Sequence, residues 1–219
     1  MRWSARETVA GFAQSPPNET LMRYAGGLSR TLSGGVALDI GCGAARNGVP
    51  LAKAGWRVIG TDTSEPMLEA AARRFRQEDL DGSATLVRAT MDALPVADRT
   101  ADLVIAHGIW NLARTGVEFR AAVRDAARAA RPGAGLFLFT FSRRTLPDQV
   151  TPLDGETFVF TEFAGEPQCF LTAQQIVEEL GAAGFTPDGI VPLHELNRPT
   201  GLLRSATGPV IYEGTFRRD

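Results

Sequence analysis

The chain has 219 residues, a formal net charge of −2 at pH 7 and a pI near 5.8. Its 44% hydrophobic and 22% charged residues are typical of one globular domain with a proper core. This balance lacks the broad basic field that nucleic-acid binding requires, and no apolar run has membrane-spanning length. The start shows no signal-peptide pattern, and Cys42 and Cys169 suit neither a disulfide framework nor a zinc site. We expect a cytoplasmic protein without a metal.

Residues 1–35 are expected to form a helical cap of two short helices. Ser15-Pro16-Pro17 divides them, because proline ends one helix and fits the first turn of the next. Ser-Pro-Pro also resembles the start of a motif of amino-methyltransferases that act on bases. Asn18 stands where that motif has an aromatic residue, which argues against such a role.

The segment from Val36 to Asp62 has the pattern strand, tight turn, helix, strand, acid. Gly41 and Gly43 follow the first apolar run and let the backbone pass close to a ligand. The helix after them directs its N-terminal amides at the same place. Asp62 ends the neighbouring parallel strand, so its carboxylate faces the crevice where open α/β sheets bind ligands. A carboxylate there suits the two hydroxyls of a ribose, because it accepts two hydrogen bonds.

Two classes of nucleotide-type ligand fit this unit. A dinucleotide fold favours G-x-G-x-x-G, but the third glycine position holds Arg46. The spelling D-x-G-C-G, which begins at Asp39, resembles motif I of class I S-adenosylmethionine-dependent methyltransferases. Ala45 departs from that family, which commonly has glycine at this position.

The next elements follow from hydrophobic periodicity and capping residues. They are a helix from Met67 to about Gln77 capped by Thr63 or Ser64, strands Ala84–Ala89 and Ala101–Ala106, a helix Val117–Ala130 stopped by Arg131-Pro132-Gly133, and a strand Leu136–Phe141.

The resemblance extends to the loops after the third and fourth strands. It gives Asp92 the position that accepts from the adenine amino group, and Met91 the position that packs on the ring. The segment with His107 and Trp110 would lie beside the sulfonium end of the cofactor. His107 either assists deprotonation of the acceptor or only lines the cofactor, and an aromatic ring such as Trp110 could favour the cation.

Prolines and glycines punctuate the chain from Ser142 to Phe170, which predicts a loop with a short strand or hairpin near the acceptor entrance. Thr172 and Gln175 form a capping box that opens a helix to about Ala183. Two late strands, Gly189–Leu193 and Val210–Phe216, have no helix between them. They are expected to form an antiparallel pair at the sheet edge, as in the methyltransferase sheet.

These patterns together resemble a class I methyltransferase of the small-molecule type, with similarity to the tellurite-resistance and thiopurine enzymes. The implied fold is α/β: a Rossmann-like three-layer αβα sandwich whose seven-stranded, mostly parallel sheet ends in an antiparallel strand. The expected single domain comprises a cap (1–35), a cofactor-binding core (36–141), a substrate-side insertion (142–171) and a C-terminal helix with edge strands (172–219).

The resemblance implies S-adenosylmethionine as cofactor, S-adenosylhomocysteine as product and a small-molecule acceptor. The oligomeric state is not indicated. A non-catalytic cofactor-binding protein and a nucleic-acid or protein methyltransferase stay as alternatives. The expected cofactor contacts are Asp39, Gly41, Cys42, Gly43, Arg46, Asp62, Thr63, Met67, Met91, Asp92, Ala93, His107 and Trp110. His107 is the candidate catalytic residue, and Trp3, Tyr24, Asn111 and Arg143 are candidate substrate contacts.

Overall fold

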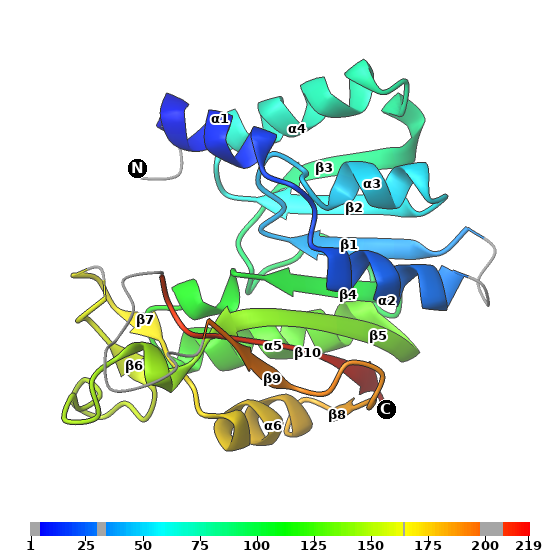
Figure 1. The fold of residues 1–219 in the computed structure, drawn as a ribbon. Helices are drawn as coiled ribbons and strands as arrows, with labels where there is room; N and C mark the ends of the chain where they lie inside the picture. The colour runs from blue at the N-terminus through cyan, green and yellow to red at the C-terminus, as the bar shows by residue number, and fades with distance from the viewer. Residues whose placement is uncertain (1–4, 30–33, 164, 198–207) are drawn as a thin grey trace.

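The computed structural model describes residues 5–29, 34–163, 165–197 and 208–219 (Figure 1). Its elements in chain order are α1 (Arg6–Gln14), α2 (Glu19–Ser29), β1 (Val36–Ile40), α3 (Gly48–Lys53), β2 (Arg57–Asp62), α4 (Glu65–Gln77), η2 (Asp81–Ser83), β3 (Ala84–Arg88), β4 (Ala101–His107), η3 (Trp110–Leu112), α5 (Gly116–Ala129), β5 (Ala130–Phe141), η4 (Arg143–Thr145), β6 (Val159–Phe160), β7 (Gln168–Cys169), α6 (Ala173–Gly181), β8 (Phe185–Pro187), β9 (His194–Leu196) and β10 (Ile211–Arg218). None of the helices in these parts of the chain combines the length and the apolar composition of a membrane span.

The main sheet has eight strands in the order β3-β2-β1-β4-β5-β10-β8, and β9 also pairs with β10. The first five strands of this order are parallel, whereas β10 is antiparallel to β5. This confirms the predicted mostly parallel sheet with a reversed last strand. The chain winds outward in opposite directions from β1 and from β4, so a ligand crevice is expected at the carboxyl ends of these two strands.

Helices cover both faces of the sheet and bury two apolar layers. On one face, side chains of α5 and α6 pack with Leu38, Val104 and Leu136. On the other, side chains of α2, α3 and α4 pack with Leu103 and Phe137. The strands between these layers are nearly all apolar, as parallel strands covered on both sides must be.

The N-terminal cap consists of two helices, as predicted. α2 packs on the sheet face through Leu21 and Tyr24. α1 instead lies along α4 (Figure 1), where Val9 contacts a small apolar cluster with Met67 and Ala70. Residues 15–18 connect the two helices and pass beside the carboxyl end of β1. The cap therefore reaches both the sheet and the crevice.

The predicted hairpin exists as the antiparallel pair β6 and β7. Phe160 and Phe170 join it to Phe141 at the end of β5, and the rings of Phe141 and Phe170 stack with centroids 5.4 Å apart. This small aromatic cluster fixes the hairpin on the side of the sheet where β4 and β5 end (Figure 1).

The predicted strand Gly189–Leu193 is wrong. Gly189 has φ +72° and Pro192 has no N–H, so this segment cannot continue a ladder. The pairing with β10 is made on either side of it, by β8 and β9. Both segments run along β10, which explains why the sheet has eight strands where the sequence predicted seven.

Candidate active site

The turn after β1 uses left-handed backbone at three positions. Gly41 and Gly43 have φ values of +68° and +52°, and Ala45 has φ +57°. A Cβ on Gly41 would lie 2.6 Å from Ile109 Cδ1, so only glycine fits there. A Cβ on Gly43 would meet nothing closer than Phe12 at 3.8 Å, because this glycine faces open space. Backbone can therefore approach a ligand closely at Gly43.

Asp62, at the end of β2, is held across this turn by two backbone donors. The N–H of Gly43 donates to Oδ2 at 2.9 Å, and the N–H of Ser64 donates to Oδ1 at 2.8 Å. Each carboxylate oxygen can accept a further hydrogen bond. The carboxylate is thus fixed, negatively charged and still able to accept from two hydroxyl groups.

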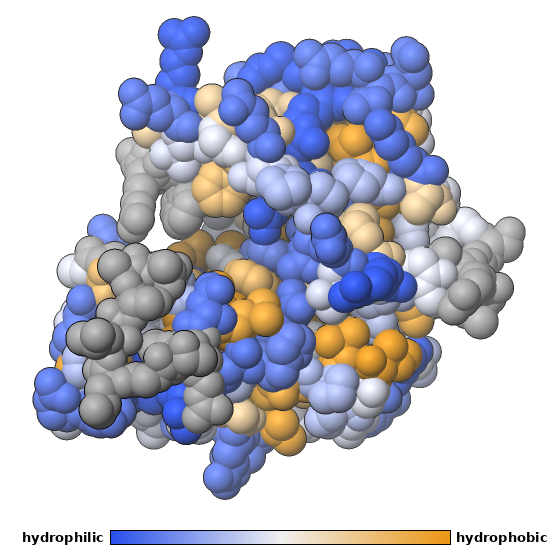
Figure 2. Space-filling view, viewed as in Figure 1, coloured by the Kyte–Doolittle hydropathy of each residue, from blue (hydrophilic) through white to orange (hydrophobic). Residues whose placement is uncertain are grey.

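A cavity of about 280 Å³ opens at the carboxyl ends of β1, β2 and β4. Figure 2 shows a hollow on this side of the molecule with hydrophobic side chains inside it. Its lining comes from the turn after β1, the end of β2, the start of α4, the loop after β3, the segment after β4, and single residues of α1 and α5. These residues are Phe12, Gly41, Gly43, Thr61, Asp62, Thr63, Met67, Ala89, Thr90, Met91, His107, Gly108, Ile109, Leu112 and Glu118.

His107 ends β4 at the wall of the cavity and is held on several sides. Its ring stacks on Phe139 of β5 with centroids 4.2 Å apart. Arg46 Nη2 lies 3.0 Å from its Nδ1 and 2.9 Å from its Nε2, so Arg46 donates to the imidazole. Burial, and then the charge of Arg46, lower the pKa of His107 to about 3. At neutral pH the ring is uncharged, and it is a weak base.

Asp39 is a buried acid whose charge interacts with that of Arg46. Its side chain is only 2% exposed, and burial raises its pKa to about 7, although Arg46 acts in the opposite direction and Asp62 in the same one. Asp39 does not line the cavity. Its place is behind the turn, where it stabilises the Arg46 cation.

Sequence reasoning missed a polar junction at Asn18. Its N–H donates to Asn47 Oδ1 at 3.0 Å, and its Oδ1 accepts from the N–H of Leu21 at 2.8 Å. Its Nδ2 donates to Glu213 Oε2 at 2.7 Å and lies 3.4 Å from Nε2 of His107. Asn18 and Glu213 are 195 residues apart, so no local pattern could reveal the pair.

Of the predicted cofactor contacts, most lie at the cavity. Gly41, Gly43, Asp62, Thr63, Met67, Met91 and His107 are in its lining, and Arg46 contacts His107. Cys42 is buried behind the turn, where burial raises the pKa of its thiol well above the usual value. Asp92 and Ala93 are exposed and lie outside the lining.

Trp110 and Asn111 do not line the cavity, contrary to the prediction for Trp110 as a cofactor contact and Asn111 as a substrate contact. Both are buried in η3, and the Trp110 ring packs edge-on against Phe119. Leu112 at the end of η3 and Ile109, which precedes η3, face the cavity instead.

The other predicted substrate contacts lie elsewhere. The buried Tyr24 packs over Gly135, in the amino-terminal half of the sheet, and donates to Asp188 Oδ2 at 2.7 Å. Arg143 donates to backbone carbonyls of the following loop, including that of Val150 at 2.7 Å, and covers the Phe160 ring. These two side chains hold structure together. Trp3 lies outside the described residues.

Leu112 and Glu118 line the cavity although sequence analysis did not propose them. Glu118 belongs to the first turn of α5, where Thr115 caps the helix and accepts from the N–H of Glu118. The spacing of Thr115 and Glu118 signals a helix start. It does not reveal which helix starts point into the crevice.

Comparison with known proteins identifies the class. A family model described as a methyltransferase domain matches residues 37–133. The chain is similar to demethylmenaquinone methyltransferase of Mycolicibacterium paratuberculosis, with 28% identity over 221 residues and 90% of each chain covered. It is 30% identical to the enzyme of that name from Lactiplantibacillus plantarum over 167 residues, which cover 68% of this chain and 69% of that one.

A solved structure shares the fold. 1,6-didemethyltoxoflavin-N1-methyltransferase of Burkholderia thailandensis, with bound 1,6-didemethyltoxoflavin and S-adenosylhomocysteine, matches with a TM-score of 0.64 and 21% identity. The match covers 92% of this chain and 79% of that one. The chain therefore belongs to the class I S-adenosylmethionine-dependent methyltransferases.

The cavity fits the cofactor of this class. Gly43 leaves room at the turn, Asp62 has acceptor capacity for a ribose, and Met67 and Met91 provide apolar walls for a flat base. S-adenosylmethionine is the cofactor, and it supplies an electrophilic methyl group on a positively charged sulfur.

Proposed function

We propose that this protein transfers a methyl group from S-adenosylmethionine to a small-molecule nucleophile that enters the cavity beside His107. The position of Asp62 carries the proposal, because two backbone N–H groups fix its carboxylate at the cavity wall. A charged carboxylate is rarely left facing an apolar cavity unless it binds something there. A ribose is the group that it fits best.

The proposed roles follow the geometry. Asp62 binds the ribose, and Met67 and Met91 pack against the adenine ring. Gly41 and Gly43 have no side chain, so the cofactor can lie close to the backbone of the turn. Asp92 stays our prediction for the acceptor of the adenine amino group.

The protein accelerates the reaction mainly by positioning, because a neutral His107 with a pKa of about 3 is a poor general base. Orienting two reactants in a closed cavity can supply up to ~7–11 kcal/mol. Phe12 of α1 and the segment after β4 would close the cavity against water.

Two relatives support a small acceptor, since they are named for demethylmenaquinone and 1,6-didemethyltoxoflavin. The net charge of −2 supports the same choice over a nucleic acid. We also propose that the protein works in the cytoplasm. Its two cysteines are free and buried, which agrees with a reducing compartment.

Calorimetric titration with S-adenosylhomocysteine tests the proposal, with NAD and NADP as controls. We expect selective binding of S-adenosylhomocysteine. Asp62→Ala should weaken it about 10–100-fold, because two charged hydrogen bonds to the ribose are lost. Glu69→Gln removes a charge from the exposed face of α4 and should bind as the wild type does. An unchanged dissociation constant for Asp62→Ala, or preference for a nicotinamide cofactor, would contradict the proposal.

A further inference from the structure

The side chain of Asn18 lies between an acidic group, the carboxylate of Glu213, and a basic group, the imidazole of His107. Glu213 of β10 is a carboxylate only 3% exposed, and His107 of β4 is an imidazole at the cavity wall. The Asn18 amide nitrogen lies between them, 2.7 Å from Glu213 Oε2 and 3.4 Å from His107 Nε2. The carboxylate is therefore satisfied by an amide donor and makes no bond to the imidazole.

The backbone fixes Asn18 at this point. Its Oδ1 caps α2 by accepting from the N–H of Leu21, and its own N–H donates to Asn47 in the turn after β1. The backbone oxygen of Asn18 accepts from the N–H of Met22 at 3.0 Å, so every polar group of Asn18 is engaged. Such a side chain has one orientation, and its amide NH₂ always points at Glu213 and His107.

The other charged or titratable groups around His107 act in different directions. Arg46 donates to the ring and opposes its protonation, and the charge of Asp39 interacts with that of Arg46. His194 of β9 lies 3.9 Å from Glu213 Oε1, on the side away from Asn18's bond to Oε2. Phe139 of β5 covers one face of the imidazole. The carboxylates of Asp62 and Glu118 line the same cavity. Of the groups that Asn18 contacts, Glu213 is the one that would favour a charged His107 if nothing separated them.

We propose that Asn18 is a positioning residue of the active site: it separates Glu213 from His107 and so adds to burial and Arg46 in keeping the imidazole uncharged at the cavity wall. Arg46 already places one cation beside His107, and a charged imidazole would add another that repels the cationic sulfur of the cofactor. This last step rests on the proposed function. The separation of Glu213 from His107 does not, since it concerns only groups of the chain.

The test is an NMR titration of the imidazole, which is simple because the chain has only two histidines. His194→Gln assigns the remaining signal to His107. In the wild type we expect His107 to stay neutral through pH 5–8. Asn18→Ser keeps an N-cap oxygen for α2 but is too short to bridge to Glu213. In this variant the pKa of His107 should rise above its wild-type value, while burial and Arg46 still hold it below the ordinary value of 6.5.

Glu213→Gln in the Asn18→Ser background should return His107 to its wild-type behaviour, since the facing charge is gone. Asn18→Asp retains the cap as well, and it offers a second way to place a carboxylate beside His107 if the serine variant does not fold. An unchanged His107 titration in a folded Asn18→Ser protein would overturn the proposal. The proposal would also be overturned if the pKa of His107 were the same in Asn18→Ser and in the double variant that carries Glu213→Gln as well.

A binding readout separates this role from a merely structural one. S-adenosylmethionine carries a charge on sulfur and S-adenosylhomocysteine does not. In Asn18→Ser, affinity for the charged ligand should fall relative to affinity for the neutral one as the pH is lowered through the raised pKa of His107, by up to about tenfold per pH unit. Equal loss for both ligands would mean that Asn18 only supports the fold. Absence of binding of either ligand by the wild type would refute the proposed function and leave the His107 titration as an independent result.

Discussion

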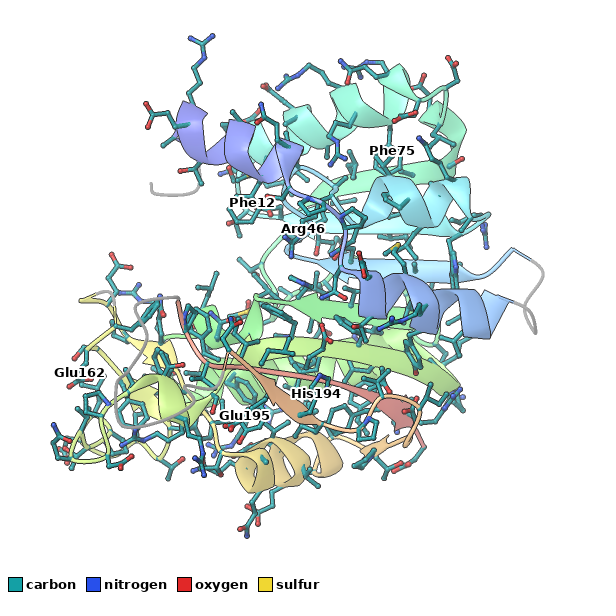
Figure 3. The ribbon with its side chains drawn as sticks, viewed as in Figure 1. Phe12, Arg46, Phe75, Glu162, His194 and Glu195 are labelled. Carbon is teal, nitrogen blue, oxygen red and sulfur yellow. The ribbon has the colours of Figure 1, made fainter. Side chains whose placement is uncertain are left out.

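Arg46 interacts with two groups whose pKa values move in opposite directions. Burial raises the pKa of Asp39 to about 7 and lowers that of His107 to about 3. Figure 3 shows Arg46 just below Phe12. The third glycine position of a dinucleotide fold would have no room for this cation. The residue that argued against a nicotinamide cofactor is therefore also the centre of the site's electrostatics.

This pair predicts an unusual pH dependence of stability. Between pH 4 and 6.5 the folded state binds more protons than the unfolded state at Asp39, and fewer at His107. The first effect lowers stability as pH rises, and the second raises it, so the two oppose each other. Relative to the wild type, His107→Gln should lose stability as pH rises through this range, and Asp39→Asn should gain it.

The slope of each difference should approach about 1.4 kcal/mol per pH unit, the value for one net proton. Urea unfolding at several pH values measures it. If both variants followed the wild-type curve at a constant offset, the pKa assignments of Asp39 and His107 would be wrong.

Ala45 shows what a departure from the family pattern costs. At φ +57° it occupies the left-handed region, which disfavours side chains by roughly 1–2 kcal/mol. Its buried methyl group and its lower unfolded-state entropy than glycine recover much of that. The turn therefore keeps its shape without the usual glycine.

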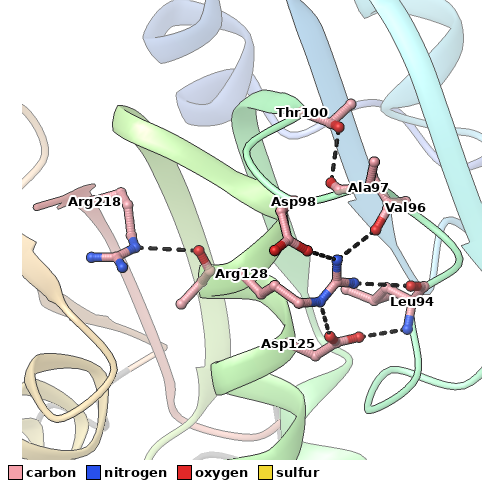
Figure 4. Close-up of polar contacts among 9 residues, drawn as sticks. Leu94, Val96, Ala97, Asp98, Thr100, Asp125, Arg128 and Arg218 are labelled. Atoms are coloured by element: carbon pink, nitrogen blue, oxygen red, sulfur yellow. Dashed lines mark hydrogen bonds and ion pairs between the residues drawn. The ribbon is translucent and has the colours of Figure 1, made fainter.

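At the scale of elements, side chains of α5 hold the loop that follows Met91. Arg128 of α5 donates to the carbonyls of Val96 and Leu94 at 2.6 and 3.1 Å and pairs with Asp98 and Asp125 (Figure 4). The carboxylate of Asp125 also accepts from the N–H of Leu94. One side chain thus holds the loop that carries Met91 into the cavity.

Arg128→Ala should destabilise the fold by about 1–3 kcal/mol, because two loop carbonyls and the carboxylates of Asp98 and Asp125 lose their donor. For a chain of this size that corresponds to a melting temperature lower by roughly 2–12 °C. Arg120→Ala is a matched control, since it also removes an arginine of α5, but one that pairs with Glu179 of α6 and not with the loop. We expect only Arg128→Ala to weaken S-adenosylhomocysteine binding; equal weakening in both would contradict the anchoring role.

In α1, we expect Phe12 to contribute more to cofactor binding than to the stability of the fold. It contacts the body through one small cluster around Val9, while Phe12 is 37% exposed and lines the cavity. Phe12→Ala should leave the melting temperature of the free protein within about 2 °C, because an exposed side chain contributes little. It should weaken S-adenosylhomocysteine binding several-fold through lost apolar burial. Loss of stability without loss of affinity would show that Phe12 supports the fold and not the site.

Sequence reasoning located strand ends well and side-chain directions poorly. Asp62 was placed correctly at the crevice because a strand end is fixed by the sheet. Trp110 was misplaced because a one-turn helix decides which of four successive side chains faces the cavity. Asn18 and Glu213 were invisible, since only the strand order β5-β10 brings residues so distant in sequence together.

At the scale of the whole molecule, the cavity joins many elements of the first half of the chain, from Phe12 to Glu118. Its walls come from α1, the turn after β1, β2, α4, the loop after β3, the segment after β4, and α5. A ligand that bridges so many elements stabilises them together, because it binds only when all are in place.

We therefore expect one cooperative thermal transition that S-adenosylhomocysteine shifts as a unit. At 100 times its dissociation constant a ligand adds ≈ 2.7 kcal/mol of stability. For a chain of 150–250 residues this raises the melting temperature by roughly 5–11 °C. Tryptophan fluorescence and far-ultraviolet circular dichroism should report the same shift, since Trp56 and Trp110 belong to opposite apolar layers of the sheet. If only one probe responded, the two layers would unfold separately, and the proposal of a single domain would have to be replaced by one of two independently folding units.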